Sequence, residues 1–369
     1  MTRLWMALLG ALPLLAVAQP LDLLHWWTSG SEAQTLAELR QTARTTGVPW
    51  QESPVAGAVN ANTLLKTRFL SGHPPALAQI DKAVSVWGEA VPLADLSGVA
   101  QGWRQVLPPV IAAELQYQGR TVAVPINVHR LNTLWSNLAL LQRHGLEVPR
   151  TWEAFFAAGD KLKAAGVIPL AIGGSVGQKF SVFADVVLGQ GGPQFFRRAL
   201  VQGDAALLAG PQMLQMLRDF KRVKAYTDAG QAGRDYDCTP APGHGALHYF
   251  EFDRILFFKP ASAQQADDQR RLAAALMQPA DSTRFARIKG GIPVRVDADL
   301  AGFNACARRS HQDFKAGSAD GSLTLALGAQ LPEATHGAYR DVISAFWASD
   351  RMTAEQAQQR LLRASRVID

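Results

Sequence analysis

The chain has 369 residues, a formal net charge of +6, and a composition that is 48% hydrophobic and 18% charged. This length is sufficient for two domains with substantial cores. The basic residues are scattered, and their densest clusters, Arg270-Arg271 and Arg308-Arg309, are not interleaved with aromatic residues. This distribution argues against nucleic acid as a partner and favours an ordinary solvated surface.

The first residues have the pattern of a secretory signal. Arg3 precedes an apolar run over 4–16, which is too short to span a bilayer, and Ala16-Val17-Ala18 fits the small-x-small cleavage pattern. We therefore expect residues 1–18 to be removed with cleavage near Ala18. No cysteine stands directly after the run, and no later segment reaches the apolar length of a membrane helix.

Hydrophobic periodicity predicts alternating strands and helices in the first third of the chain. This order predicts a parallel sheet covered by helices. The expected elements are a strand over 21–27, helices over 31–45 and 63–70, and a short buried strand over 76–80.

The remainder also alternates between strand and helix patterns. Thr151 is the expected N-cap of a helix over 152–165, and Gly166 ends it. No long linker interrupts the chain, so we expect two lobes that share crossing strands and enclose a cleft closed by a hinge motion. The other expected elements are strands over 121–126, 168–172 and 250–258, a Gly-Gly turn into a short strand within 288–294, and helices over 132–144, 180–188, 211–226, 263–277, 338–346 and 354–363.

The segment His25-Trp26-Trp27-Thr28-Ser29-Gly30-Ser31-Glu32 has the composition of a polyol site. Indole faces can cover the C–H patches of a sugar ring, while short polar groups and a carboxylate take its hydroxyls. Consecutive strand side chains point to opposite faces, so one of the two tryptophans is expected in the core whatever the function.

Other chemistries leave weaker patterns. Gly173-x-Ser175-x-Gly177 has the letters of a nucleophile elbow, and Asp253 and His336 follow in the chain order of a hydrolase triad. There is no phosphate-binding loop and no histidine pair at metal spacing, so neither cofactor nor metal is expected. The two cysteines, Cys238 and Cys306, are either one disulfide or two buried thiols.

Several segments together resemble one family. They are the 25–32 segment, Leu65-Lys66-Thr67-Arg68-x-x-Ser71-Gly72-x-Pro74-Pro75-x-x-x-Gln79-Ile80, Val124-Pro125-Ile126-Asn127-Val128-His129-Arg130 followed by Leu134-Trp135, Tyr226-Thr227-Asp228-Ala229-Gly230, and Gly290-Gly291-Ile292-Pro293-Val294-Arg295. The chain resembles the periplasmic glucose/mannose-binding proteins of bacterial ABC importers, in the solute-binding family that includes maltose-binding protein. The resemblance implies an α/β, two-lobed periplasmic binding protein fold of class II type.

The resemblance also implies a non-enzymatic, monomeric periplasmic receptor that delivers a small sugar to an ABC permease. Its sugar contacts would be Trp26, Trp27, Glu32, Asp253 and Lys289. A family lysine corresponds to Asp81 here, and Lys82 follows it, so Lys82 is the nearest equivalent. The implied lobes are 19–127 plus 254–299 and 128–253 plus 300–369.

The chain departs from the family mainly at the expected cleft. Gly233-Arg234-Asp235 runs straight into Tyr236-Asp237-Cys238, where the family has a further strand and helix, so the second lobe is expected to be shortened. Family aromatic and histidine contacts correspond to Gly177, Thr133 and Leu327. A binding-deficient or altered-ligand paralogue is therefore an alternative to a glucose/mannose receptor.

Overall fold

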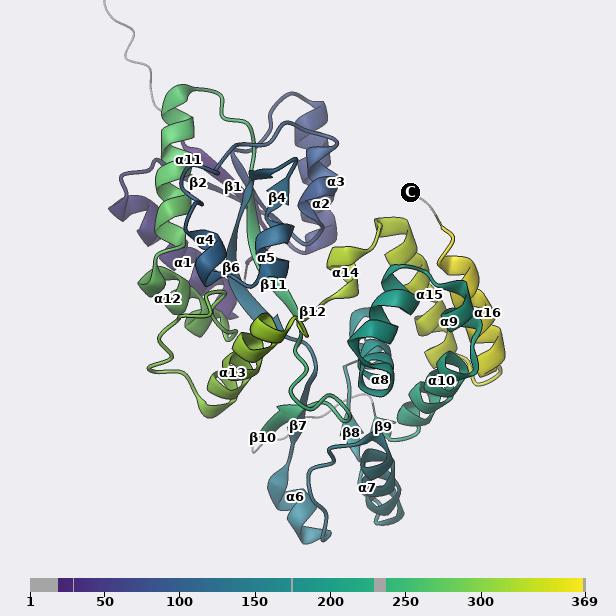
Figure 1. The fold of residues 1–369 in the computed structure, drawn as a ribbon. Coiled ribbons are helices and arrows are strands. Elements are labelled where there is room, and N and C mark those ends of the chain that lie inside the picture. Colours follow the sequence, from purple (N-terminus) through teal and green to yellow (C-terminus); the bar gives the residue numbers. More distant parts are fainter. Residues whose placement is uncertain (1–18, 29, 174, 229–236, 368–369) are drawn as a thin grey trace, which may run out of the picture.

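The computed structural model describes residues 19–28, 30–173, 175–228 and 237–367. The chain forms two lobes, each with its own hydrophobic core (Figure 1). The expected signal at 1–18, the junction at 229–236, Ser29 and Gly174 lie outside the described residues. No helix within the described ranges is long and apolar enough to cross a membrane.

The first lobe is built on one mixed sheet with strand order β12-β11-β3-β1-β2, and β6 pairs with β11. Strands β1 (Leu21–His25), β2 (Trp50–Pro54) and β3 (Leu77–Ile80) are parallel, whereas β11 (Tyr249–Phe257) runs antiparallel to β3 and to β6 (Ala123–Arg130). Every residue of β3 is buried, as a central strand covered on both faces requires. The parallel arrangement expected for 21–80 is confirmed.

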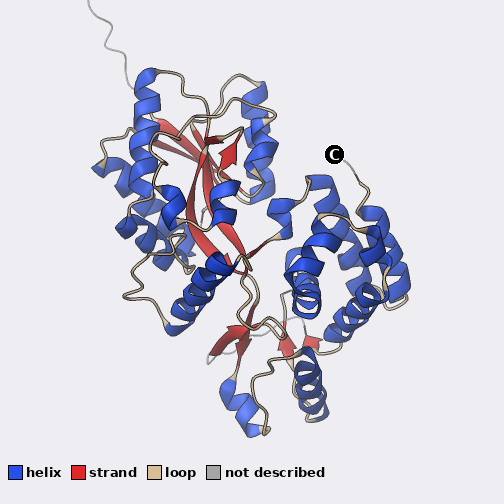
Figure 2. Cartoon of the chain, in the orientation of Figure 1, coloured by secondary structure: helices blue, strands red, loops and turns tan. Residues whose placement is uncertain are grey.

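Helices cover both faces of this sheet (Figures 1 and 2). One layer contains α1 (Gly30–Thr45), α11 (Ala263–Leu276) and α12 (Pro279–Lys289), and the other contains α2 (Ala58–Leu70) and α3 (Val84–Gly88). The other elements of the lobe are α4 (Trp103–Val106), α5 (Pro109–Glu114), β4 (Gln116–Tyr117), β5 (Arg120–Thr121), α13 (Ala305–Asp320) and β12 (Thr324–Leu325).

The second lobe is mainly helical (Figure 2). Its helix α7 (Trp152–Ala164) begins where Thr151 Oγ1 accepts a hydrogen bond from Ala154 N, as the sequence predicts. The buried stripe of α10 (Pro211–Lys224) has the three- and four-residue spacing of an amphipathic helix. The other elements are β7 (Thr133–Ser136), α6 (Leu138–Arg143), β8 (Leu170–Ala171), α8 (Val176–Phe196), a π-helical turn (Arg197–Val201), α9 (Ala205–Ala209), β9 (Thr227–Asp228), β10 (Asp237–Pro240), α14 (Leu327–Gln330), α15 (Glu333–Ala348) and α16 (Ala354–Ala364).

Two predicted elements differ from the structure. The expected helix over 132–144 is instead β7 followed by the short α6, because β7 pairs antiparallel with the distant β10. The short strand expected after the Gly-Gly turn within 288–294 is reduced to a single bridge between Ile292 and Val128.

The two cores show where the chain passes from one lobe to the other. Within the described residues there are three crossings: after Val128, between Tyr249 and Phe250, and between Leu325 and Ala326. The division implied by the resemblance places the last two boundaries at 253/254 and 299/300. The difference arises because the ring of Phe314, on α13, packs against Phe250 in the first core.

Candidate ligand-binding cleft

A cleft of about 700 Å³ lies between the lobes, close to the crossing strands. Its first-lobe wall includes residues from the ends of β1 and β3, from the first turn of α1 and from the end of α12. Its second-lobe wall comes from the start of α8 and from α14 and α15. Pockets of a few hundred to a thousand Å³ are typical of small-molecule sites.

A charged cluster forms one side of the cleft. Lys289 Nζ lies 3.2 Å from Glu32 Oε1 and 3.6 Å from Asp253 Oδ2. Only 6% of the Lys289 side chain is exposed, so this ammonium is held largely out of water between the two carboxylates. Three elements that are distant in the sequence, α1, β11 and α12, thus converge on one point of the cleft.

Asp253 is the most connected member of this cluster. His129 Nε2 lies 3.1 Å from Asp253 Oδ2, and Gln79 Nε2 donates to Oδ1 at 3.5 Å. Burial raises the pKa of the Asp253 carboxyl, but the hydrogen bond with His129 and the charge of Lys289 outweigh burial, so the pKa lies below its usual value. Asp253 is therefore an ionised acceptor at neutral pH.

The two tryptophans have different positions. Trp26 is partly buried and lines the cleft, and its backbone N–H donates to Gln79 Oε1 at 3.1 Å. Trp27 is 1% exposed in the first core and is not among the residues that line the cleft. The Lys289 ammonium lies 4.5 Å from the centre of its ring, so Trp27 acts on the cleft through Lys289. This placement differs from the expectation that both indoles contact the ligand.

The remaining predicted contact, Lys82, also lines the cleft. Five of the six predicted residues, Trp26, Glu32, Lys82, Asp253 and Lys289, are therefore brought together on one cavity.

The opposite wall carries fewer ring systems than the family pattern suggests. Gly177 and Leu327, which occupy positions of family ligand contacts, both line the cleft. Thr133 lies in β7 and is not part of this wall. Phe180 is the aromatic side chain of α8 in the cleft, and its ring contacts His336.

Sequence reasoning did not single out several other charged or polar side chains that line the cleft as ligand contacts, among them His129, His336 and Arg340. His129 lies within the Val124–Arg130 motif, so this motif could have been used to predict His129 as a residue of the cleft. Arg340 follows His336 by four residues on α15, so the two share one helix face, but no motif marks that helix.

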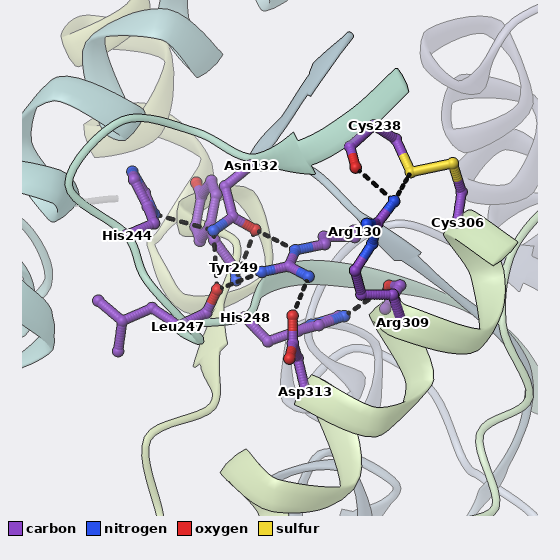
Figure 3. A network of polar contacts seen from close by, with 11 residues as sticks. Arg130, Asn132, Cys238, His244, Leu247, His248, Tyr249, Cys306, Arg309 and Asp313 are labelled. Carbon is purple, nitrogen blue, oxygen red and sulfur yellow. Dashed lines mark hydrogen bonds and ion pairs between the residues drawn. A yellow bond between two sulfur atoms is a disulfide. The ribbon is translucent and has the colours of Figure 1, made fainter. Parts of the chain in front are cut away.

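A buried polar network connects the lobes beside the crossing strands (Figure 3). Arg130 donates to Asp313 on α13 at 2.6 Å and to Asn132 Oδ1 at 3.1 Å. Asn132 Nδ2 lies 2.8 Å from His244 Nδ1, and His244 Nε2 lies 2.9 Å from the Asp185 carbonyl on α8. The chain of contacts therefore runs from the first core into the second.

Cys238 and Cys306 form a disulfide, which decides between the two alternatives left open by the sequence (Figure 3). It joins β10 to α13, and Arg309 donates to the Cys238 carbonyl at 2.8 Å. Asp237 lies close to both sulfur atoms, but sulfurs bonded to each other are not thiolate ligands for a metal.

The possible nucleophile elbow has a structural role instead. Ser175 Oγ accepts a hydrogen bond from Gln178 N and caps α8. Asp253 is paired with His129 and Lys289, whereas His336 packs on Phe180. The Ser175, Asp253 and His336 side chains therefore form no triad.

A cleft between two lobes, with crossing strands at its base and charged and aromatic side chains on its walls, defines a two-lobed binding protein. The model of the bacterial extracellular solute-binding protein family matches residues 25–236. The chain belongs to this family, and it is therefore a binding protein and not an enzyme.

Individual comparisons agree with this assignment. A probable sugar-binding periplasmic protein of Mesorhizobium japonicum is 31% identical, with 95% of this chain and 94% of the relative covered. An uncharacterized ABC transporter extracellular-binding protein of Pyrococcus horikoshii is 23% identical over 88% of this chain and 83% of its own. The solved structure of a chitin oligosaccharide binding protein matches with a TM-score of 0.77 at 16% identity, covering 94% and 98% of the chains. The α/β periplasmic binding protein fold expected from the sequence is thereby confirmed.

Proposed function

We propose that this chain is the substrate-binding component of an ABC importer, and that it binds a monosaccharide of the glucose or mannose kind in the cleft. The names of the Mesorhizobium and Pyrococcus relatives support sugar binding and the transporter association. In this proposal residues 1–18 direct export to the periplasm and are cut near Ala18, and the mature monomer carries the sugar to the permease.

The observation that carries the proposal is the cluster of Asp253, Lys289 and Glu32 in the same cleft as Trp26. An ionised carboxylate accepts hydrogen bonds from ring hydroxyls, and the Lys289 ammonium donates to a ring oxygen or hydroxyl. Such charge-assisted hydrogen bonds are about twice as strong as neutral ones. The Trp26 indole provides an apolar face for the C–H side of the ring.

Closure of the lobes is the proposed mechanism. The chain crosses between the lobes at a few closely spaced strands, so a rotation there moves α8 and α15 toward the first-lobe wall. Closure removes water from the cleft and strengthens each polar contact with the sugar. The closed form would then dock on the permease.

Calorimetric titration with glucose, mannose, galactose and xylose tests the proposal. At least one sugar is expected to bind saturably, and Asp253→Asn is expected to weaken it about tenfold or more, because an ionised acceptor is lost. Asp299→Asn, which changes an exposed carboxylate outside the cleft, is the matched control and should bind like the parent. Equal affinities for both variants would contradict the assigned site.

An altered-ligand or binding-deficient protein is the second candidate. It is favoured by Gly177 and Leu327, which supply no ring or polar group where the family pattern has ligand contacts. Each lost aromatic contact removes about 1 kcal/mol, and a tenfold loss in affinity corresponds to about 1.4 kcal/mol. Flat titrations with every sugar and sugar derivative tested would favour the binding-deficient form.

A further inference from the structure

Two basic side chains on opposite walls of the cleft lack a protein partner. Lys82 follows β3 on the first-lobe wall, and Arg340 lies on α15 on the second-lobe wall. Within the described ranges, neither side chain forms an ion pair or a hydrogen bond, and Arg340 Nε is buried without a partner.

The other cations of this cleft are all neutralised by the protein. Lys289 is paired with Glu32 and Asp253, and the buried Arg254 pairs with Glu114 and donates to the Lys82 carbonyl at 2.6 Å. A buried donor without an acceptor costs about 1–3 kcal/mol. Arg254 Nε is also buried without a hydrogen-bond partner, so what distinguishes Lys82 and Arg340 from Arg254 and Lys289 is that no carboxylate within the described ranges pairs with them.

Two cations, Lys82 and Arg340, and two carboxylates that are not paired to a cation, Asp81 and Glu251, face this part of the cleft. Burial and the charges of Lys82 and Arg340 together lower the pKa of His336 to about 4, against the opposing charge of Asp81. His336 is therefore neutral near pH 7. Asp81 accepts a hydrogen bond from Asn62 Nδ2 at 3.0 Å, and Glu251 is the other carboxylate of the cleft not paired to a cation.

We propose that Lys82 and Arg340 form an anion subsite, and that the ligand is a monosaccharide bearing a carboxylate or a phosphate. The inference rests on the proposed sugar-binding function and specifies its substrate class. The ring lies against Trp26 and the Asp253–Lys289 pair, and the anionic group is held between the two lobes. The Arg340 guanidinium can donate two parallel hydrogen bonds to a carboxylate or phosphate, and Lys82 adds a point charge.

The position of the two cations also connects ligand charge to closure. Lys82 belongs to one lobe and Arg340 to the other, so a ligand group that contacts both side chains joins the two lobes. The anion offsets the repulsion between two like charges that closure brings together. A neutral sugar leaves that repulsion in place and is therefore expected to bind more weakly.

Calorimetry with matched pairs of ligands tests the inference. D-glucuronate, D-galacturonate and glucose 6-phosphate are compared with D-glucose and D-galactose at one fixed low salt concentration. At least one charged sugar is expected to bind tenfold or more tightly than its neutral parent, and the advantage should shrink as salt rises. If the uronates bind more tightly than glucose 6-phosphate, the anionic group is a carboxylate; if glucose 6-phosphate binds more tightly, it is a phosphate.

Variants connect the preference to the two residues. Arg340→Gln and Lys82→Gln should each reduce the ratio of the affinity for the charged sugar to the affinity for its neutral parent about tenfold. Arg340→Lys keeps the positive charge but loses the planar guanidinium, so its affinity for the charged sugar should lie between those of the parent and Arg340→Gln. If Arg340→Gln does not fold, Arg340→Lys still tests the role of the guanidinium. Arg351→Gln, an exposed cation outside the cleft, is the control.

The outcomes separate this inference from the proposed function. If neutral sugars bind as tightly as charged ones, or if the charge preference survives both glutamine variants, the anion subsite is wrong although sugar binding stands. If no neutral or charged sugar binds to the folded protein, the proposed function itself fails and the inference fails with it.

Discussion

Gly291 is the residue at which the turn after α12 meets the strand β6 most tightly. Gly290 ends α12 in the left-handed conformation, with φ at 84°, which glycine adopts without a steric penalty. A Cβ on Gly291 would lie 2.5 Å from the Val128 carbonyl oxygen and 2.8 Å from Asn127 Nδ2. The pair of glycines therefore lets Lys289 reach the cleft beside β6.

Gly291→Ala should lower the free energy of unfolding by about 2 kcal/mol, because the added methyl forces the turn away from β6. The displacement also moves Lys289, so affinity for the ligand should fall. Urea unfolding measures the first effect and calorimetry the second. Gly98→Ala, with no atom within 4 Å of its added Cβ, is the control, and equal stability of the two variants would contradict the packing argument.

The residues that line the candidate cleft were predictable from sequence where they lie in short motifs. Trp26, Glu32 and Lys289 lie within or next to such motifs, and Asp253 is marked by its position inside an apolar strand. Alternation along the strand showed that one tryptophan would be buried, but only the tertiary structure shows that it is Trp27. Arg340 carries no such local signal, because its role depends on how α15 faces the other lobe.

At the scale of elements, the sequence predicted the helices whose first residues are fixed by a capping side chain nearby in the chain. The helix α7 begins at a capping threonine, and α11 begins where Ser262 Oγ accepts from Gln265 N. The strand β7 was not predictable in this way, because its pairing with β10 joins residues about a hundred positions apart. Helical spacing over 132–144 was overridden by this long-range pairing.

The disulfide between β10 and α13 makes a prediction at this scale. It closes a loop with a sequence separation of 68 residues, for which the chain-entropy estimate of stabilisation is about 4 kcal/mol. The double variant Cys238→Ser/Cys306→Ser should lose about 2–5 kcal/mol of unfolding free energy. Chemical denaturation measures this loss.

A reductant provides the matching control for the disulfide. Dithiothreitol should lower the melting temperature of the parent protein and leave that of the double serine variant unchanged. A parent whose melting temperature does not respond to the reductant, with the disulfide verified as reduced, would contradict a stabilising role.

At the scale of the whole molecule, the two lobes are connected by crossing strands and by the polar network around His244. The sequence predicted the two lobes and their crossing, but it did not indicate that α13 and β12 belong with the first core. That assignment depends on packing between Phe314 and Phe250, which are 64 positions apart and share no motif.

The same network makes stability depend on pH. Burial and the charge of Arg130 together lower the pKa of His244 to about 4, against the opposing effect of the hydrogen bond with the Asp185 carbonyl. A neutral ring protonated on Nε2 donates to that carbonyl and accepts from Asn132 on Nδ1, so both contacts are satisfied without a charge.

Between pH 6.5 and 4 the unfolded chain binds a proton at His244 that the folded chain does not bind. The stabilisation is therefore complete above pH 6.5 and is lost as the pH falls toward 4, by up to about 3 kcal/mol from this residue. His244→Gln should be less stable than the parent at pH 7, because the network is disrupted, but its unfolding free energy should fall less steeply with acid. Urea unfolding at pH 7, 6, 5 and 4.5 measures both slopes. The exposed His73→Gln should keep the slope of the parent, and an unchanged slope in His244→Gln would show that the buried histidine does not couple folding to protons.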